Sequence, residues 1–118
     1  MEEFSINLDQ THPQPILELK GYFTHEAGIE LQKQIQELLR AKKEQFIIDF
    51  GNCPVINSPG VALLLDVIMQ VNEDFKGVVF LTRLDALKAK VFRMAGILLY
   101  SQNAPTIEDA LKAFSELE

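Results

Sequence analysis

Ser58 is the residue whose surroundings in the sequence best suit a chemical role. It stands between a β-branched and aromatic stretch, Gln45 to Phe50, and an apolar run, Val61 to Val71. The first stretch predicts a strand and the second a helix, so residues 52–60 are interpreted as a strand-to-helix loop. Pro59 suits the first helical position, where its missing N–H is not needed, and this places Ser58 at the N-cap. A serine here is either a helix cap, worth about 1 kcal/mol, or part of a functional loop.

The sequence offers little that would make Ser58 a catalytic nucleophile. Such a serine needs a general base and an oxyanion hole, and the G-x-S-x-G nucleophile elbow is absent. Nothing connects the two histidines, His12 and His25, to Ser58. Neither histidine has a cysteine at metal-ligand spacing, so a zinc site is not expected. The loop also lacks the glycine-rich patterns that hold nucleotide phosphates.

The remaining reactive side chains favour structural roles. Cys53 is the only cysteine, so it cannot form an internal disulfide, and we interpret it as a small buried residue rather than a reactive thiol. Asp49 and Asp66 lie on different predicted elements, and nothing in the sequence pairs them as a general acid and base. We therefore expect no enzymatic activity, no cofactor and no metal.

Charge and hydropathy narrow the classes of partner. The 118 residues carry a net charge of −6, whereas nucleic-acid binders concentrate Lys and Arg. Direct binding to nucleic acid or to an anionic membrane is therefore disfavoured. The longest apolar run is interrupted by Asp66 and Gln70 and is too short to span a bilayer. Because Met1 to Glu3 lack the features of a signal peptide, we expect a single cytoplasmic domain over residues 1–118.

Hydrophobic periodicity predicts the element order β-β-α-β-α-β-α-β-α, typical of an α/β fold with a largely parallel sheet and an antiparallel initial hairpin. In such sheets, functional sites tend to lie at the carboxyl ends of the strands, where the Ser58 loop falls. Strands are predicted at Phe4 to Leu8, Ile16 to Leu19, Phe46 to Phe50, Val78 to Leu81 and Ile97 to Tyr100. Helices are predicted after Thr24, from Pro59 to Phe75, from Asp85 to Met94 and after Thr106.

Helical spacing assigns faces to the second and third helices. In the second helix, the inward face is predicted to hold Val61, Leu64, Ile68, Val71 and Phe75. This leaves Ala62, Leu63 and Met69 as an apolar fringe that could contact a partner. In the third helix, the inward positions are predicted to be Leu84, Leu87, Val91 and Met94, with Lys88, Lys90 and Arg93 facing water.

Several segments together resemble the STAS domain, as found in bacterial anti-sigma-factor antagonists. The resemblance covers essentially the whole chain. It implies the STAS fold, a mixed, mostly parallel sheet of four or five strands packed with about four helices. It is carried by IIDF at 47–50, VINSPGVALLL at 55–65, GVVFLT at 77–82, LKAKVFRMAG at 87–96 and EDALKAF at 108–114.

The resemblance also implies a site. The family's loop reads D-S-S-G, and its first serine is phosphorylated in the partner-switching members. Aligned on Gly60, Ser58 takes the phosphoacceptor position, Asn57 replaces the aspartate and Pro59 replaces the second serine. The implied partner is an anti-sigma factor that is also an ATP-dependent serine kinase, and the implied contacts are Asn57, Ser58, Pro59, Gly60, Ala62, Leu63 and Met69.

The implied mechanism is a switch. Phosphorylation adds roughly −1.5 to −2 charges, which a helix N-terminus tolerates but a buried interface without a countercharge does not. Such a protein would act as a monomer or weak homodimer without membrane insertion. Two alternatives stay open: an unphosphorylated STAS interaction subunit of a transporter or signalling complex, and a small-ligand-binding STAS module.

Overall fold

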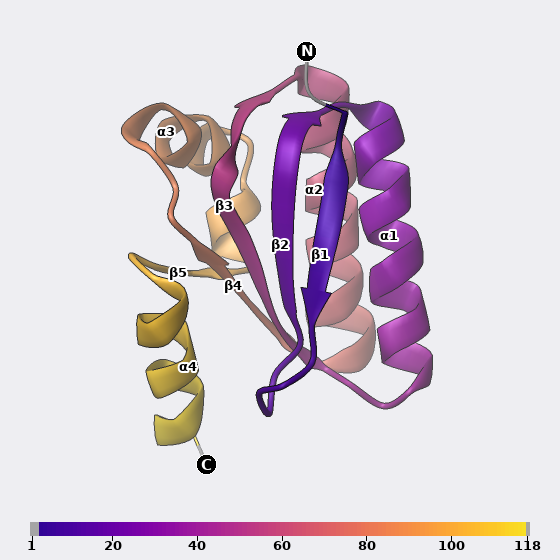
Figure 1. The fold of residues 1–118 in the computed structure, drawn as a ribbon, viewed down its shortest axis with the longest axis vertical. Coiled ribbons are helices and arrows are strands. Elements are labelled where there is room, and N and C mark those ends of the chain that lie inside the picture. Colours follow the sequence, from indigo (N-terminus) through magenta and orange to yellow (C-terminus); the bar gives the residue numbers. More distant parts are fainter. Residues whose placement is uncertain (1–2, 118) are drawn as a thin grey trace.

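The computed structural model describes residues 3–117, and within this range five strands form one sheet (Figure 1). The strands lie side by side in chain order. β1 is antiparallel to β2, and every other neighbouring pair is parallel. The predicted mixed, mostly parallel sheet with an initial hairpin is therefore confirmed. The strands are β1 Ser5–Asp9, β2 Ile16–Phe23, β3 Gln45–Ile56, β4 Val78–Thr82 and β5 Gln102–Ala104.

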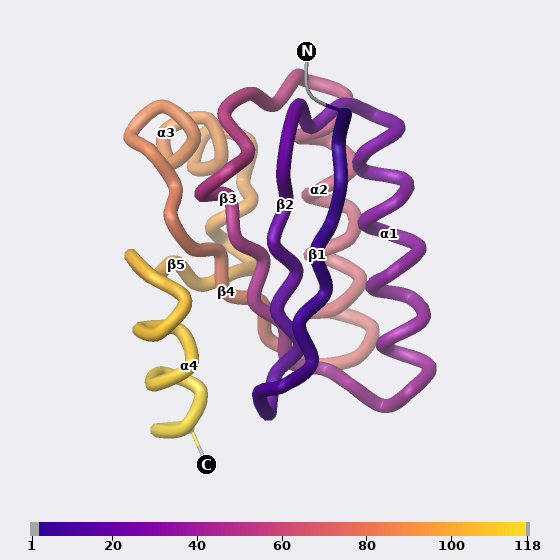
Figure 2. Tube along the Cα trace, in the orientation of Figure 1, coloured from indigo at the N-terminus to yellow at the C-terminus, as the bar shows by residue number. Residues whose placement is uncertain are grey.

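The helices cover both faces of the sheet. α1 and α2 pack together on one face, with α3 farther along the same layer, while α4 covers part of the opposite face (Figure 2). No helix within residues 3–117 has both the length and the apolar character needed to cross a membrane. The helices are α1 His25–Arg40, α2 Ser58–Met69, α3 Ala86–Met94 and α4 Ile107–Glu116. A π-helical turn, Gln70–Asp74, continues α2, and a 3-10 turn, Ile97–Leu99, follows α3.

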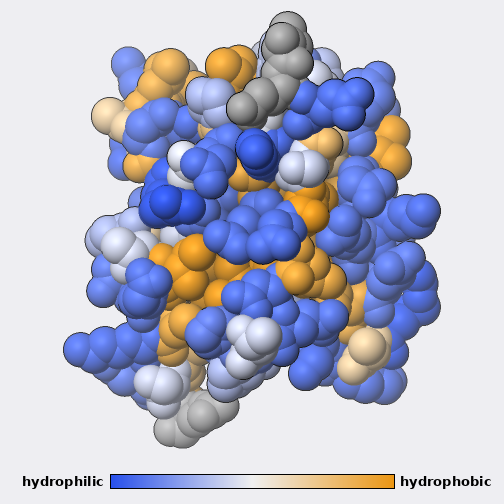
Figure 3. Space-filling view, in the orientation of Figure 1, coloured by the Kyte–Doolittle hydropathy of each residue, from blue (hydrophilic) through white to orange (hydrophobic). Residues whose placement is uncertain are grey.

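β3 is buried on both faces, as its unbroken apolar sequence predicts. Phe46, Ile48 and Phe50 belong to the larger core beneath α1, α2 and α3, whereas Ile47 belongs to a smaller core beneath α4. Because α4 covers only part of its face, hydrophobic residues remain visible over the middle of the sheet, bordered by hydrophilic ones (Figure 3). Since its side chains contribute to both, β3 lies between the two cores.

β3 is longer than predicted, and the expected loop at residues 52–60 is wrong. The strand continues to Ile56 because Asn52, Val55 and Ile56 pair with β2. β4 pairs with β3 only as far as Asp49, so the later part of β3 has one neighbour rather than two. Pro54 is tolerated there because a strand with one free side does not need every N–H for pairing.

The predicted strand at 97–100 is also wrong. These residues form the 3-10 turn, which follows Gly96 in a left-handed conformation with φ of 88°, and the fifth strand begins only at Gln102. The predicted helix from Pro59 to Phe75 is an α-helix only as far as Met69, after which its hydrogen bonding becomes π-helical. The amphipathic period does not distinguish these local changes of hydrogen bonding.

The face of α3 differs in part from the one predicted: Leu84 and Val91 pack against the larger core as predicted, but Leu87 and Met94 do not. Leu87 and Met94 are 71% and 78% exposed, whereas Lys88 is 5% exposed and Phe92 is fully buried. Phe92 inserts into the larger core and makes an edge contact with Phe50, at a ring-centre distance of 5.4 Å. The Lys88 stem is buried while its amine bonds Asp85 at 2.6 Å, which satisfies the charge. Phe92 and the stem of Lys88 therefore face the core in place of Leu87 and Met94.

Asp49 anchors the carboxyl end of β3 to β4. Its carboxylate is 1% exposed and accepts hydrogen bonds from Thr82 Oγ1 at 2.7 Å, Arg83 Nη2 at 2.6 Å and the Gly51 N–H at 3.2 Å. Burial raises the pKa of Asp49, but the donors of Arg83, Thr82 and Gly51 outweigh it and hold the pKa below its usual value. The guanidinium lies over Gly51, where an added Cβ would be 2.1 Å from it. Nothing in the sequence indicated this cluster.

We expect Asp49→Asn to lower the free energy of unfolding by about 1–3 kcal/mol, because it leaves buried donors without an acceptor. Urea unfolding at neutral pH measures this value. Asp66→Asn, a matched change at an exposed aspartate of α2, is expected to stay within about 0.5 kcal/mol of wild type. Equal losses in the two variants would contradict the anchoring role of Asp49.

The same cluster predicts a pH dependence. Because the pKa of Asp49 is lower in the folded than in the unfolded chain, its stabilisation is present above the unfolded pKa and is lost as pH falls through the folded pKa. The stability difference between wild type and Asp49→Asn should therefore be largest near neutral pH and shrink in acid. Urea midpoints measured from neutral to strongly acidic pH test this, and a difference that grew in acid would contradict it.

Candidate functional site

α2 begins directly after β3, and Asn57 rather than Ser58 caps it. Asn57 has an extended backbone, with φ of −97° and ψ of 170°, and its Oδ1 accepts a hydrogen bond from the Gly60 N–H at 2.9 Å. The prediction that Ser58 is the N-cap is therefore wrong by one residue. Asparagine caps helices as well as serine does, and Pro59 is tolerated at the second helical position because its N–H would also be unpaired there.

Ser58 is consequently the first residue of α2, and its side chain is exposed. No described residue forms a hydrogen bond with its hydroxyl. The positive end of the α2 dipole lies at this position, so a negative group attached to the hydroxyl would be stabilised rather than repelled by the helix. The arrangement gives an accessible hydroxyl that the fold does not use.

Gly60 sets the distance between α2 and β2. A Cβ at Gly60 would lie 2.6 Å from the Phe23 carbonyl oxygen and 2.7 Å from the Phe23 ring. The Asn57 N–H donates to the same carbonyl at 3.1 Å, so the end of β2 and the start of α2 are in direct contact. A larger residue at position 60 would push the helix N-terminus, and Ser58 with it, away from the sheet.

An apolar hollow of about 310 Å³ lies beside Ser58, between α2 and α3. We call it the Ser58 hollow; its lining consists of Ser58, Val61, Val91, Met94 and Ala95. Met94 is largely exposed at its border, and hydrophobic residues are visible at α3 in Figure 3. The sequence pattern does not indicate this contribution, because helical spacing predicts that Met94 faces the core. The apolar residues of α3 are the signal that could have indicated this hollow, but their spacing places Met94 on the inward face.

The three fringe residues of α2 have different surroundings. Ala62 is exposed one turn after Ser58, whereas Leu63 and Met69 are half-buried. Leu63 packs on α1, because a Cβ added to Gly28 would lie 2.8 Å from its side chain. Of the fringe, Ala62 therefore has the greatest exposure next to Ser58. Partner contacts at all three positions remain a prediction.

Other reactive groups do not form a site. Cys53 is fully buried, and burial raises the pKa of its thiol to about 11, so it stays protonated and unreactive at neutral pH. This confirms the interpretation of Cys53 as a small buried residue. Within residues 3–117, no cluster of three or more His, Cys, Asp or Glu side chains has an arrangement that could bind a metal ion.

The chain belongs to the STAS domain family, because the sequence model of this domain matches residues 5–110. A search of curated proteins gives no significant match. Three solved structures illustrate the range of similar proteins. Phosphorylated SpoIIAA, a Bacillus cell fate determinant, is 22% identical with a TM-score of 0.68, covering 98% of this chain and 100% of its own.

The second is a serine-to-glutamate variant of Moorella thermoacetica RsbS, 13% identical with a TM-score of 0.80, covering 95% of this chain and 96% of its own. The third is a sulfate transporter family protein from Wolinella succinogenes, 18% identical with a TM-score of 0.63, covering 86% and 84%. At these identities the similarity establishes the STAS fold, as predicted, and leaves the function open.

The capping geometry predicts that Asn57 and Ser58 differ in their effect on stability. Asn57→Ala removes the acceptor of the Gly60 N–H and should lower the free energy of unfolding by about 1 kcal/mol. Ser58→Ala removes an exposed hydroxyl without a partner and should change it by less than about 0.5 kcal/mol. Denaturant unfolding of both variants measures these values. A larger loss for Ser58→Ala than for Asn57→Ala would contradict the assigned cap.

Proposed function

We propose that this protein is an anti-sigma-factor antagonist that binds an anti-sigma factor with serine kinase activity and is released when Ser58 is phosphorylated. The observation that carries the proposal is the state of Ser58. It is exposed, it is not needed as a helix cap, and it borders an apolar hollow that a partner can fill. The chain would act in this system as a binding module rather than an enzyme.

The energetics of such a switch follow from this position. A phosphate on Ser58 adds roughly −1.5 to −2 charges at the positive end of α2, so the fold itself should tolerate it. In a complex, the same group would lie against the apolar lining of the Ser58 hollow. A buried phosphate without a countercharge is costly, so the complex rather than the fold would be destabilised.

Asn57 and Pro59 differ from the family pattern at the start of α2 without removing this possibility. Asn57 provides the capping oxygen that an aspartate would also provide, and it places no negative charge beside the acceptor hydroxyl. Pro59 has no N–H, and the Gly60 N–H is bonded to Asn57, so the phosphate would depend on the helix dipole and the Ser58 N–H. Both substitutions are compatible with an anion at position 58.

The second candidate function is an unphosphorylated interaction subunit of a transporter or signalling complex. The likeness to the sulfate transporter family protein from Wolinella succinogenes favours this alternative. Pro59 also supports it, because a proline at the second position of α2 makes the start of the helix stiffer and less easily fitted into a kinase active site. In this case the Ser58 hollow would be a permanent docking site and Ser58 would have no regulatory role.

Phosphorylation distinguishes the two candidates. Incubation with ATP and a lysate of the source organism should add one phosphate group to wild type and none to Ser58→Ala, as measured by intact-mass spectrometry. Ser115→Ala is the matched control, since it removes another exposed hydroxyl, on α4, and should leave phosphorylation unchanged. An unmodified wild type would favour the interaction subunit instead.

Binding to the purified anti-sigma factor tests the docking surface. Met94→Asp should weaken binding at least about tenfold, because it places a charge at the border of the Ser58 hollow. Leu117→Asp alters a similarly exposed apolar residue after α4 and should leave binding unchanged. Ser58→Glu should retain the fold by circular dichroism and lose binding. Equal binding by Met94→Asp and Leu117→Asp would place the partner elsewhere.

A further inference from the structure

β1 is an edge strand that lacks most of the features that keep such strands from pairing with other chains. The strand order leaves β1 and β5 at the two edges, and β5 is only three residues long. β1 has five residues, SINLD, with neither proline nor lysine, and it pairs with β2 in an unbroken register. Natural edge strands are usually shortened, bulged or charged to prevent pairing. β1 therefore remains available to another strand.

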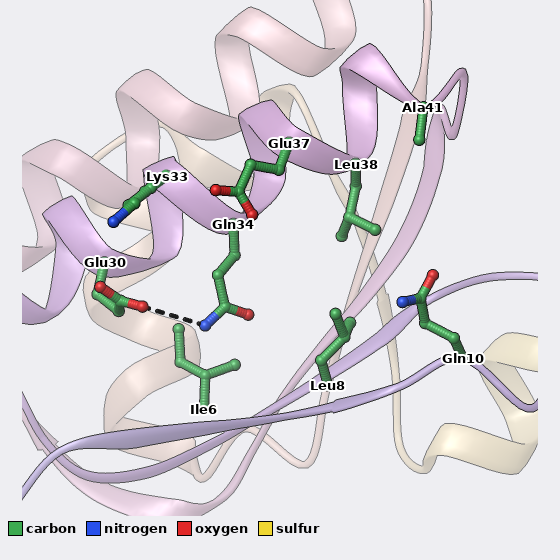
Figure 4. A pocket seen from close by; sticks show the side chains of 9 residues that line it. All are labelled: Ile6, Leu8, Gln10, Glu30, Lys33, Gln34, Glu37, Leu38 and Ala41. Atoms are coloured by element: carbon green, nitrogen blue, oxygen red, sulfur yellow. Dashed lines mark hydrogen bonds between the residues drawn. The ribbon is translucent and has the colours of Figure 1, made fainter.

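A groove of about 570 Å³ runs beside this edge, between β1 and α1 (Figure 4). Ile6 and Leu8 of β1 and Leu38 of α1 supply its apolar surface. Ile6 and Leu8 are half-buried because α1 does not close over them. Successive side chains of an added strand point to opposite faces, so every second side chain would enter this groove. The groove accordingly suits a strand with the same alternating pattern as β1 itself.

The charges on α1 make the groove complementary to a second copy of itself. Lys33 lies between Glu30 and Glu37 along the groove. A two-fold axis places the same surface on both subunits in reversed order, which can bring Lys33 of each copy beside Glu37 of the other. Two symmetric ion pairs, each between Lys33 of one copy and Glu37 of the other, would then form across the axis.

The side chain of Gln34, in the same groove, has a carbonyl oxygen without a hydrogen-bond donor among the described residues. Its Nε2 donates to Glu30 Oε1 at 3.2 Å, while its Oε1 is buried and accepts no hydrogen bond from the described residues. A buried acceptor without a donor is unfavourable. Gln34 lies next to Ile6 in Figure 4, so this unsatisfied acceptor is in the groove beside the edge strand β1.

We propose that two copies of this chain associate through β1 and α1 about a two-fold axis, with their β1 strands paired antiparallel into one continuous sheet. The proposal does not depend on the function of Ser58. In Figure 1, α1 and α3 lie on opposite sides of α2, so the Ser58 hollow would stay open in the dimer.

Charge reversal tests this arrangement with folded variants, because Lys33 and Glu37 are both exposed. Sedimentation equilibrium at 0.15 M salt, where surface charges interact over about 8 Å, should show dimers of wild type. Lys33→Glu and Glu37→Lys should each weaken dimerisation at least about tenfold, because each creates two like-charge contacts. Their equimolar mixture should recover the wild-type affinity, since every lysine then faces a glutamate.

Lys112→Glu on α4 is the matched control, because it makes the same charge change outside the groove and should leave dimerisation unchanged. Circular dichroism should confirm that every variant is folded. A wild type that stays monomeric over the accessible concentration range would overturn the proposal. Single variants that dimerise as wild type does, or a mixture that stays monomeric, would also overturn it.

Discussion

The contact between Gly60 and Phe23 is the constraint on which the geometry of the site depends. It brings the start of α2 against the end of β2 so closely that no side chain fits at position 60. The Asn57 N–H reinforces the contact through its hydrogen bond to the Phe23 carbonyl. Phe23 is itself fully buried, so this point of attachment belongs to the rigid core rather than to a flexible loop. Ser58 thereby gains a fixed position without any bond of its own.

Asn57 caps α2 and Ser58 does not, and this difference follows from the attachment of α2 to β2. A helix start needs one side-chain acceptor for its free N–H groups, and Asn57 meets that need. If Ser58 were the cap, a modification of its hydroxyl would remove a stabilising bond from the helix. Because it is not, the hydroxyl can change its chemistry while the start of α2 stays the same. A hydroxyl that does not stabilise the fold is what the proposed switch requires.

The sequence predicted the elements that depend on regular patterns and failed where a single tertiary contact decided the outcome. Alternation and helical period were sufficient for β1, α1 and the central position of β3, since burial there follows the pattern. The Thr24 and Thr106 caps were also predictable from residue type. By contrast, the face of α3 depends on Phe92 entering the core and on the Lys88–Asp85 bond, and apolar spacing encodes neither.

The candidate site shows the same division. Chemistry and position predicted a functional Ser58, but pairing of residues 52–56 with β2 moved the helix start and gave the cap to Asn57. The Asp49–Arg83 bond could not be foreseen, because it joins residues 34 positions apart. α3 gives the Ser58 hollow its apolar wall, so the proposed docking surface depends on the face of a helix whose period was ambiguous. Local sequence therefore specifies the exposed hydroxyl of Ser58, and long-range packing shapes the surface beside it.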